Sequence, residues 1–328
     1  MSVSNLGERG IIELIWSIME KDGHARGQIL PPSDDASAIL LKDGNYLVLK
    51  TDMFVRMTDA PKGMKPFQMG AKAVTMNISD LAAKGARPSA FLFSLGLPRS
   101  FPVMSLRGII SGISSAAKDY GVQVLGGDVG EAKDLIISGF AVGFAKNLVK
   151  RSGASPGDIV AVTGEFGNTA AAYKILLEGL KAPPSLKKKI CRSVYEPRAR
   201  TPLGAALAES GAITSSMDSS DGLAFTLNEL SRSSKVSFRI SCLPISKEAL
   251  EFASIHKISP EDLALYGGEE YELVVTVSPG KWKDAIRVAE AAGGALIRIG
   301  EVLPGEKVFL ARGSEEVEIP SKGWEHLK

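Results

Sequence analysis

The first half of the chain alternates apolar runs with polar segments in an order that predicts both helices and strands. Residues 6–20 repeat apolar side chains at helical spacing, and residues 66–84 predict an alanine-rich helix that ends at Gly85. A further helix is expected at 104–120. Strands are expected at 36–41, 46–51, 90–97, 122–125 and 135–145. Because some strands are adjacent and others are separated by helices, we expect a mixed α+β sheet with helices on one face.

The second half starts a new pattern after a polar stretch that contains glycine and proline, at residues 146–158. Helices are expected near 169–180, 186–194, 200–210 and 222–233, with strands near 159–163, 236–241, 271–277, 296–300 and 307–311. The pattern predicts an N-terminal domain over residues 1–146 and a C-terminal α/β domain over 147–328. A chain of 328 residues is long enough for two domains.

Composition narrows the classes of function. The formal net charge is +2 and no block of lysine and arginine stands out, so we expect no nucleic-acid partner. Three histidines and two distant cysteines argue against zinc and against a disulfide framework. The polar N-terminus is unlike a signal peptide, and no apolar run approaches the ~18 residues that span a bilayer. We therefore expect a cytoplasmic protein without a membrane partner.

Aspartates are the remaining candidates for chemistry, because the sequence has no P-loop, kinase catalytic loop or nucleophile elbow. Taken singly, Asp35, Asp52, Asp128, Asp218 and Asp221 could each be a helix cap or turn residue. Asp80 differs, because it lies late in an apolar helix and a buried carboxylate needs a partner there. Glycine, serine or threonine lies close to these six aspartates in the sequence, and such small residues let phosphates approach the backbone.

Together these aspartates predict a site for Mg²⁺ and ATP. Magnesium takes only one or two carboxylates per ion and keeps several waters, so a cluster of this size implies several ions that bridge phosphates. Arg151 follows Lys150 at the expected domain boundary. It could be a phosphate clamp or an ordinary linker arginine, and the sequence alone leaves both alternatives open.

Seven motifs in order resemble those of the thiamine-monophosphate kinase family, within the aminoimidazole ribonucleotide synthetase superfamily. They include Ser33-Asp34-Asp35, Thr51-Asp52, Asn77-Ile78-Ser79-Asp80, Gly126-Gly127-Asp128, Arg151-Ser152-Gly153, Asp218-Ser219-Ser220-Asp221 and Gly267-Gly268-Glu269-Glu270. The similarity extends from about residue 30 to Gly323-Trp324. It implies an N-terminal domain that dimerises through its sheet, and transfer of the ATP γ-phosphate to thiamine monophosphate, which gives thiamine diphosphate and ADP.

The resemblance also assigns residues. The implied magnesium ligands are Asp35, Thr51, Asp52, Asp80, Asp128, Asp218 and Asp221, and the implied ATP contacts are Gly127, Asp128, Arg151 and Ser220. Asp52, Asp80, Asp128 and Arg151 would carry catalysis. Glu269 and Trp324 would contact the thiamine part of the substrate, since an aromatic face suits a cationic ring.

Two departures from the family pattern affect these assignments. Lys50 stands where a small hydroxyl residue is common, and we place it with the metal site as a fixed positive charge. Asp59 stands where many members have a histidine that contacts the substrate, and we assign it to the substrate pocket. Glu270 also replaces a common aspartate.

The expected nucleophile is a phosphate monoester oxygen, whose second pKa is about 6, so no general base is needed. We therefore expect direct transfer without a phosphorylated enzyme. Two alternatives stay open from the sequence. One is another ATP-dependent synthetase of the same superfamily, and the other is a non-catalytic module that senses nucleotides.

Overall fold

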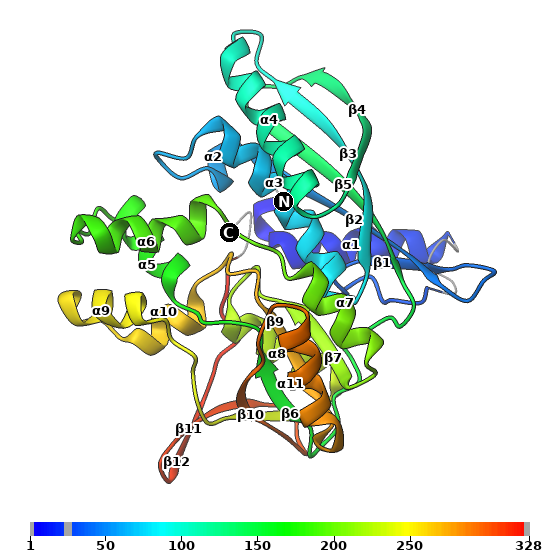
Figure 1. Ribbon diagram of the computed structural model, residues 1–328, viewed down its shortest axis with the longest axis vertical. Helices are drawn as coiled ribbons and strands as arrows, with labels where there is room; N and C mark the ends of the chain where they lie inside the picture. Colours follow the sequence, from blue (N-terminus) through cyan, green and yellow to red (C-terminus); the bar gives the residue numbers. More distant parts are fainter. Residues whose placement is uncertain (1–2, 23–27, 325–328) are drawn as a thin grey trace.

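The computed structural model describes residues 3–22 and 28–324, which form two sheets with helices packed around them (Figure 1). The first half contains α1 (Gly7–Lys21), β1 (Ser37–Leu40), β2 (Tyr46–Val55), α2 (Arg56–Asp59), α3 (Pro66–Ala83), β3 (Arg87–Leu97), α4 (Val103–Asp119), β4 (Gln123–Glu131) and β5 (Ile136–Ala145). Its five strands lie in the order β1-β2-β5-β3-β4. Only the β3–β4 pair is parallel, so the sheet is mixed as predicted.

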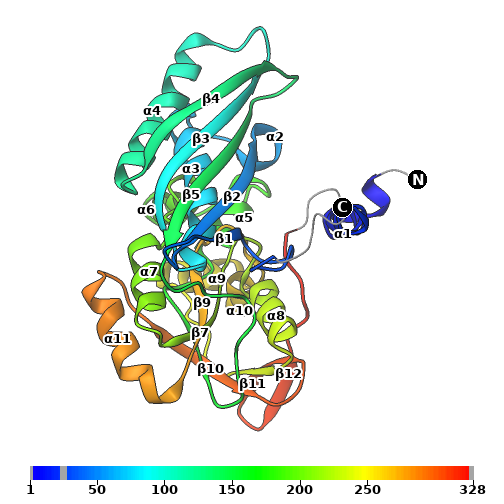
Figure 2. The same cartoon turned by 90° about the vertical axis from the view of Figure 1, so that its right-hand side faces the viewer.

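Helices α3 and α4 cover one face of this sheet, which confirms the prediction (Figure 2). Val48 and Phe54 of β2 point into that core and are almost completely buried. Within the described residues no helix covers the opposite face, which exposes large apolar side chains, including Met53, Phe140 and Phe144. We call it the open face, and it includes the alternate residues of β2 and β5.

The close packing of α3 against α4 explains why α3 is rich in small residues. A Cβ at Gly112 would lie 1.9 Å from the carbonyl oxygen of Phe67, and a Cβ at Gly70 would lie 2.1 Å from that of Ile109. The two helix backbones therefore touch at these points, where no larger residue fits. Helix α3 stops before Gly85, whose φ of +73° suits glycine, as the sequence predicted.

The second half forms an α/β domain. Its elements are β6 (Ile159–Val162), α5 (Asn168–Leu176), α6 (Pro184–Tyr195), α7 (Thr201–Glu209), β7 (Ile213–Asp218), α8 (Leu223–Ser234), β8 (Ser237–Ile240), α9 (Lys247–His256), α10 (Pro260–Tyr266), β9 (Leu273–Val277), α11 (Trp282–Ala291), β10 (Ile297–Leu303), β11 (Val308–Arg312) and β12 (Glu315–Glu318). The strand order is β12-β11-β8-β10-β6-β9-β7. Helices α8 and α10 pack on one face of this sheet, and α7, α11 and the end of α3 pack on the other.

Several predicted boundaries were wrong where polar residues lie inside strands. Strand β2 continues through Asp52 to Val55, and β4 continues through Asp128 to Glu131, so neither aspartate ends its strand. Pairing of β2 with β5 and of β4 with β3 overrides the polar character of these segments. Strand β7 was not predicted, because its sequence ITSSMD is rich in serine; α9, α10, α11 and β12 were also missed.

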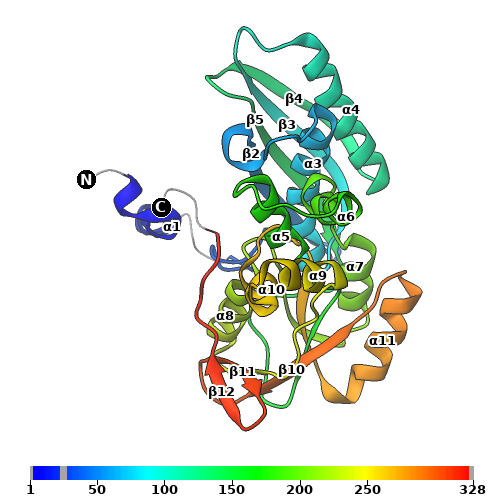
Figure 3. The same ribbon diagram turned by 90° about the vertical axis from the view of Figure 1, so that its left-hand side faces the viewer.

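The C-terminal end of the described chain runs back from β12 toward helix α1, which projects from the body of the molecule (Figure 3). After β12 the chain runs back along α8, and the backbone N–H of Trp324 donates to the carbonyl of Asp221 at 3.1 Å (Figure 3). Helix α1 projects beside this segment and exposes Leu14 and Ile18. Within residues 3–22 and 28–324, no helix combines the length and the apolar character needed to cross a membrane.

Candidate active site

Three buried carboxylates from distant parts of the chain meet at the junction of the two sheets. One oxygen each of Asp35, Asp80 and Asp218 lies within 4.8 Å of the others. Asp35 precedes β1, Asp80 lies on the last turn of α3, and Asp218 ends β7. We call this group the acidic cluster; the fold brings these three of the predicted residues together.

Three cations surround the acidic cluster and offset its charge. The Lys50 ammonium lies 2.9 Å from Oδ2 of Asp80, and the Lys84 ammonium lies 2.8 Å from Oδ2 of Asp35. Arg151 Nε donates to Oδ1 of Asp35 at 2.8 Å. Such close pairing is needed, because a buried carboxylate without a partner costs several kcal/mol.

The protonation of the three carboxylates differs with their surroundings. Burial raises the pKa of Asp80 well above its usual range, although Lys50 opposes the effect. Burial, with the nearby Asp35, also raises the pKa of Asp218 to about 6, while the Ser79 hydroxyl donates to Asp218 at 2.6 Å and lowers it. Burial acts in the same direction on Asp35, but Arg151 and Lys84 outweigh it and lower the pKa of this carboxyl.

Asp52 and Asp221 extend the acidic cluster on two sides. Asp52 lies two residues after Lys50 on β2, so both point to the covered face of the sheet. Its charge helps raise the pKa of Asp80. Asp221 lies in the turn between β7 and α8, and burial raises its pKa to about 7, with Glu8 and Asp218 adding to the effect.

The predicted substrate residues form a second group next to the turn that contains Asp221. The backbone N–H of Glu269 donates to the carbonyl of Ser220 at 2.6 Å, which places Ser220, Asp221, Trp324 and Glu269 together. Glu269 has a φ of +64°, a left-handed conformation that is uncommon for a residue other than glycine.

Lys72, which is fully buried on α3, links Glu269 to Asp59. Its ammonium lies 2.5 Å from Oε1 of Glu269 and donates to the Asp59 carbonyl oxygen at 2.8 Å. The Tyr173 hydroxyl donates to the other Glu269 oxygen. The Asp59 carboxylate accepts from the Val55 N–H at 2.6 Å, and burial raises its pKa. Asp59 and Glu269 therefore lie in the same part of the structure.

Thr51, Gly127 and Asp128 lie elsewhere in this subunit. Thr51 and Gly127 line a cavity of about 290 Å³ on the open face. Asp128 on β4 pairs with Ser94 on β3, Ser94 pairs with Ser138 on β5, and Ser138 pairs with Met53 on β2. Residues that pair directly share a face of the sheet, so the Asp128 side chain lies on the open face with Met53. Three strand spacings separate Asp128 from β2, roughly 14 Å. The close group of carboxylates in the described part of the chain does not include Asp128.

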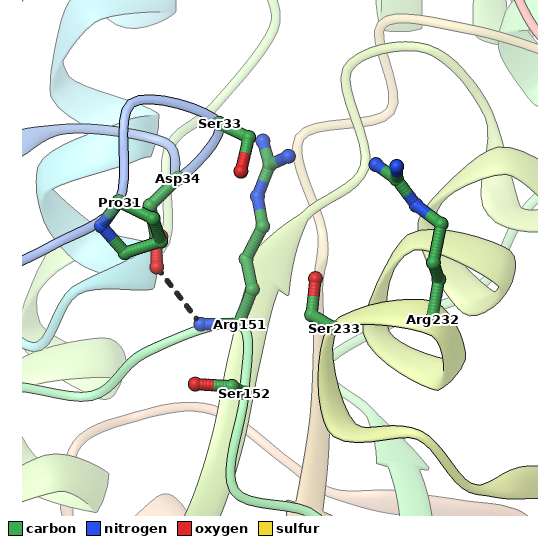
Figure 4. A pocket seen from close by; sticks show the side chains of 7 residues that line it. All are labelled: Pro31, Ser33, Asp34, Arg151, Ser152, Arg232 and Ser233. Carbon is green, nitrogen blue, oxygen red and sulfur yellow. Dashed lines mark hydrogen bonds between the residues drawn. The ribbon is translucent and has the colours of Figure 1, made fainter. Parts of the chain in front are cut away.

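A second cavity of about 310 Å³ adjoins Arg151 (Figure 4). The side chains of Arg151 and Arg232 rise from opposite walls, with Ser33 near the guanidinium of Arg151. Arg151 thus contacts both this cavity and Asp35. A position between a cavity and the carboxylates suits a phosphate contact better than it suits a linker arginine.

The residues of the acidic cluster fit a magnesium site. Carboxylate oxygens are hard donors, and Asp35, Asp80 and Asp218 converge closely enough to share hard cations. The described residues around them offer no cysteine or histidine ligand to this group. The donor set therefore matches magnesium chemistry and would suit zinc poorly.

Sequence reasoning missed the groups that hold the predicted residues in place. These are Lys72, Ser79, Lys84, Tyr173 and Arg232. Lys72 and Lys84 did carry a signal, because both are charged residues in an alanine-rich helix and both have 0% exposure. A lysine in such a helix requires a carboxylate partner, and the partners proved to be Glu269 and the Asp34–Asp35 pair.

Comparison with known proteins shows which family this chain resembles over its length. The family model for the N-terminal domain of AIR synthase related proteins matches residues 33–145, and the model for their C-terminal domain matches residues 155–312. The chain is 39% identical to the thiamine-monophosphate kinase of Pyrococcus horikoshii, over 99% of this chain and 98% of the relative.

Solved structures give the same result. The structure described as AaThiL complexed with AMPPCP and TMP superimposes with a TM-score of 0.86 at 30% identity, covering 99% of each chain. Thiamine monophosphate kinase from Aquifex aeolicus has a TM-score of 0.79 at 28% identity, over 93% of this chain and 97% of that one. Both domains, their order and the full-length similarity lead to one conclusion: this chain belongs to the thiamine-monophosphate kinase family of AIR synthase related proteins.

Proposed function

We propose that this chain is a phosphotransferase that moves the γ-phosphate of ATP to thiamine monophosphate, giving thiamine diphosphate and ADP. The observation that carries the proposal is the acidic cluster, with Arg151 beside it and the Glu269 group next to it. The names of the relatives support the choice of substrate. The same names disfavour a different synthetase or a module that only senses nucleotides.

In this proposal the acidic cluster holds Mg²⁺, which neutralises and aligns the two phosphates when bound. Asp35, Asp80 and Asp218 supply the central carboxylates, and Asp52 and Asp221 supply outer ones. Lys84 holds Asp35 in place from within the core, and Ser79 fixes the orientation of Asp218. No side chain has to remove a proton, because the acceptor phosphate is already ionised near neutral pH.

Arg151 and Ser220 are the proposed nucleotide contacts in the same subunit. Arg151 lies between Asp35 and the cavity that it shares with Arg232, and its Nη1 lies 3.9 Å from Oε2 of Glu229. A phosphate that enters this cavity would therefore meet the guanidinium. Ser220 lies in the turn before α8, next to Asp221. The pair would bring the nucleotide to the acidic cluster from the side of the C-terminal domain.

Glu269, Asp59 and Trp324 are the proposed contacts for the thiamine part of the substrate. Lys72 and Tyr173 fix the Glu269 carboxylate. Trp324, a residue that is 57% exposed, bonds through its backbone to Asp221, next to the Ser220 that Glu269 contacts. An indole face attracts a cationic ring, and a carboxylate adds to that preference. The positive thiazolium ring therefore matches the chemistry of this group.

We further propose that the chain works as a homodimer in the cytoplasm. The open face exposes Met53, Phe140 and Phe144, and β4 is an edge strand whose residues are all exposed. Exposed apolar faces and unpaired edges of this kind are commonly covered by another chain. A second copy on this face would meet Thr51, Gly127 and Asp128, the residues that lie apart from the acidic cluster.

Turnover with labelled substrates tests the function. ATP that is labelled in its γ-phosphate, mixed with Mg²⁺ and thiamine monophosphate, should give label in thiamine diphosphate and none in the protein. Thiamine, pyridoxal phosphate and a nucleoside monophosphate serve as competing acceptors and should react at least ~10²-fold more slowly. Preferred transfer to another acceptor, or a labelled protein that forms with ATP alone, would overturn the proposal.

A further inference from the structure

Lys50 occupies an unexpected position inside the proposed metal site. Its ammonium lies 2.9 Å from Oδ2 of Asp80, and Asp52 and Asp218 also act on its charge. The side chain is only 22% exposed and that of Asp80 only 10%. Lys50 is therefore surrounded by three carboxylates of the site.

The strand that carries Lys50 holds it in this position. Lys50 pairs with Ala141 in the middle of the β2–β5 ladder, so its backbone cannot shift without breaking the sheet. Val48 and Phe54, which point to the same face, are buried in the core. Alternation along β2 therefore directs the Lys50 side chain toward α3 and Asp80.

An ammonium and a metal ion compete for the same oxygen atoms. Magnesium requires ligand oxygens at about 2.1 Å in octahedral geometry, and each carboxylate oxygen that pairs with an ammonium loses part of its capacity to bind an ion. Mutual repulsion also disfavours a divalent ion next to a fixed positive charge. The Lys50 ammonium already supplies a cation between Asp80 and its neighbours.

We propose that the Lys50 ammonium permanently fills one cation position of the acidic cluster, so that each subunit binds one metal ion fewer than it would with a small residue at position 50. The inference rests on the proposed function insofar as the acidic cluster is taken to bind divalent ions. It concerns the number of ions and is independent of the identity of the acceptor.

The variant Lys50→Ser tests the number of ions directly. Calorimetric titration with Mn²⁺, in the presence of a non-hydrolysable ATP analogue, should show one more ion per subunit in Lys50→Ser than in the natural protein. Lys133→Ser removes an exposed lysine outside the site and should leave the number unchanged. Equal numbers in the natural protein and in Lys50→Ser would overturn the proposal.

Two further measurements keep the proposal testable if Lys50→Ser folds poorly. In crystals of the natural protein soaked with Mn²⁺ and the ATP analogue, Lys50 should stay within hydrogen-bond distance of Asp80. An anomalous peak in place of its ammonium would contradict the proposal.

The second measurement is thermal unfolding. In EDTA, the melting temperature of Lys50→Met should be lower than that of the natural protein. Addition of Mn²⁺ should raise the melting temperature of Lys50→Met more than it raises that of the natural protein; equal melting temperatures in EDTA would also contradict the proposal.

Turnover assays on the same preparations separate this inference from the proposed function. If Lys50→Ser gains an ion while the natural protein fails to use thiamine monophosphate, the proposed substrate is wrong and the role of Lys50 stands. If the natural protein uses thiamine monophosphate but the number of ions does not change, the inference alone fails.

Discussion

The acidic cluster, at the junction of the two sheets, and the open face of the first sheet are built in opposite ways. Asp35, Asp80 and Asp218 are buried, and each has a cation or hydroxyl beside it. The open face exposes phenylalanine and methionine side chains and includes Asp128 on an edge strand. The first region is complete within one chain, whereas the second has the features of a surface that needs a partner.

This difference explains why residues of one predicted site lie in two places. Buried charges require partners from the same core, so the acidic cluster depends on the packing of α3, β2 and β7. Exposed residues such as Gly127 and Asp128 carry no such requirement and can serve a second molecule. The comparison thus predicts strong effects from single changes in the cluster, and effects on the open face that depend on assembly.

The largest effect is expected for Asp80→Asn, which removes a central carboxylate with little change in shape. Its kcat/KM with ATP and thiamine monophosphate should fall by about 10³-fold, because a charge that binds metal in the transition state is lost. Asp43→Asn, in an exposed hairpin turn, is the matched control and should keep full activity. Near-normal turnover of a folded Asp80→Asn protein would refute the assignment.

Mixed subunits test whether Asp128 serves the partner. Asp128→Asn should also lose most activity, yet co-expressed Asp80→Asn and Asp128→Asn chains should recover about a quarter of the natural activity. Half of the dimers would then combine both variants, and each of these would contain one intact site. If the mixture stays inactive, Asp128 acts within its own subunit or the dimer differs from the one proposed.

Disruption of the open face should change the mass of the particle. Phe140→Asp places a charge in the apolar surface and should convert the dimer to a monomer in light scattering. Met57→Asp, at a side chain that is 81% exposed and outside this face, should leave the dimer intact. A Phe140→Asp protein with unchanged mass would exclude this face as the main interface.

Removal of a buried lysine beside the acidic cluster should lower the stability of the protein more than removal of an exposed salt bridge does. Lys84→Met leaves Asp34 and Asp35 without their buried lysine and should lower the free energy of unfolding by about 3 kcal/mol. Arg99→Met, which breaks an exposed pair with Glu131, should cost less than about 1 kcal/mol. Denaturant titration in EDTA measures both; a smaller loss for Lys84→Met than for Arg99→Met would contradict the analysis.

The smallest expected effect is on pH dependence. The pKa values of Asp218 and Asp221 are raised by burial to about 6 and about 7, so the folded state favours their protonated forms. Their contribution to stability is complete below about pH 4 and is lost as the pH rises through 7. Without metal, the melting temperature should therefore fall between pH 5 and 8, and Asp221→Asn should reduce the fall. A melting temperature that rises over this range for the natural protein would contradict it.

The sequence predicted the fold well where periodicity was clear. Helix α3 and its end at Gly85 followed from small residues and a left-handed glycine, and the one-sided cover of the first sheet followed from the order of elements. Strand β7 could not be predicted from ITSSMD, because its pairing with β9 overrides a weak local preference. Polar residues inside β2 and β4 misled the boundaries for the same reason.

The sequence indicated the three carboxylates that come together, but it did not indicate the groups that support them. Carboxylates beside glycine and serine form motifs that can be read along the chain. The link between Lys72 and Glu269, by contrast, joins positions almost two hundred residues apart, and the distance between Asp128 and the acidic cluster depends on strand order. These relations arise from tertiary packing, so a single sequence carries little trace of them.

The central claim is that Asp35, Asp80 and Asp218 hold divalent ions between two phosphorylated substrates. Anomalous diffraction from crystals that contain Mn²⁺, a non-hydrolysable ATP analogue and thiamine monophosphate tests it most directly. The account predicts manganese peaks about 2.1 Å from oxygens of these three aspartates, each in contact with a phosphate. Clear density for both substrates without manganese at these oxygens would contradict the account.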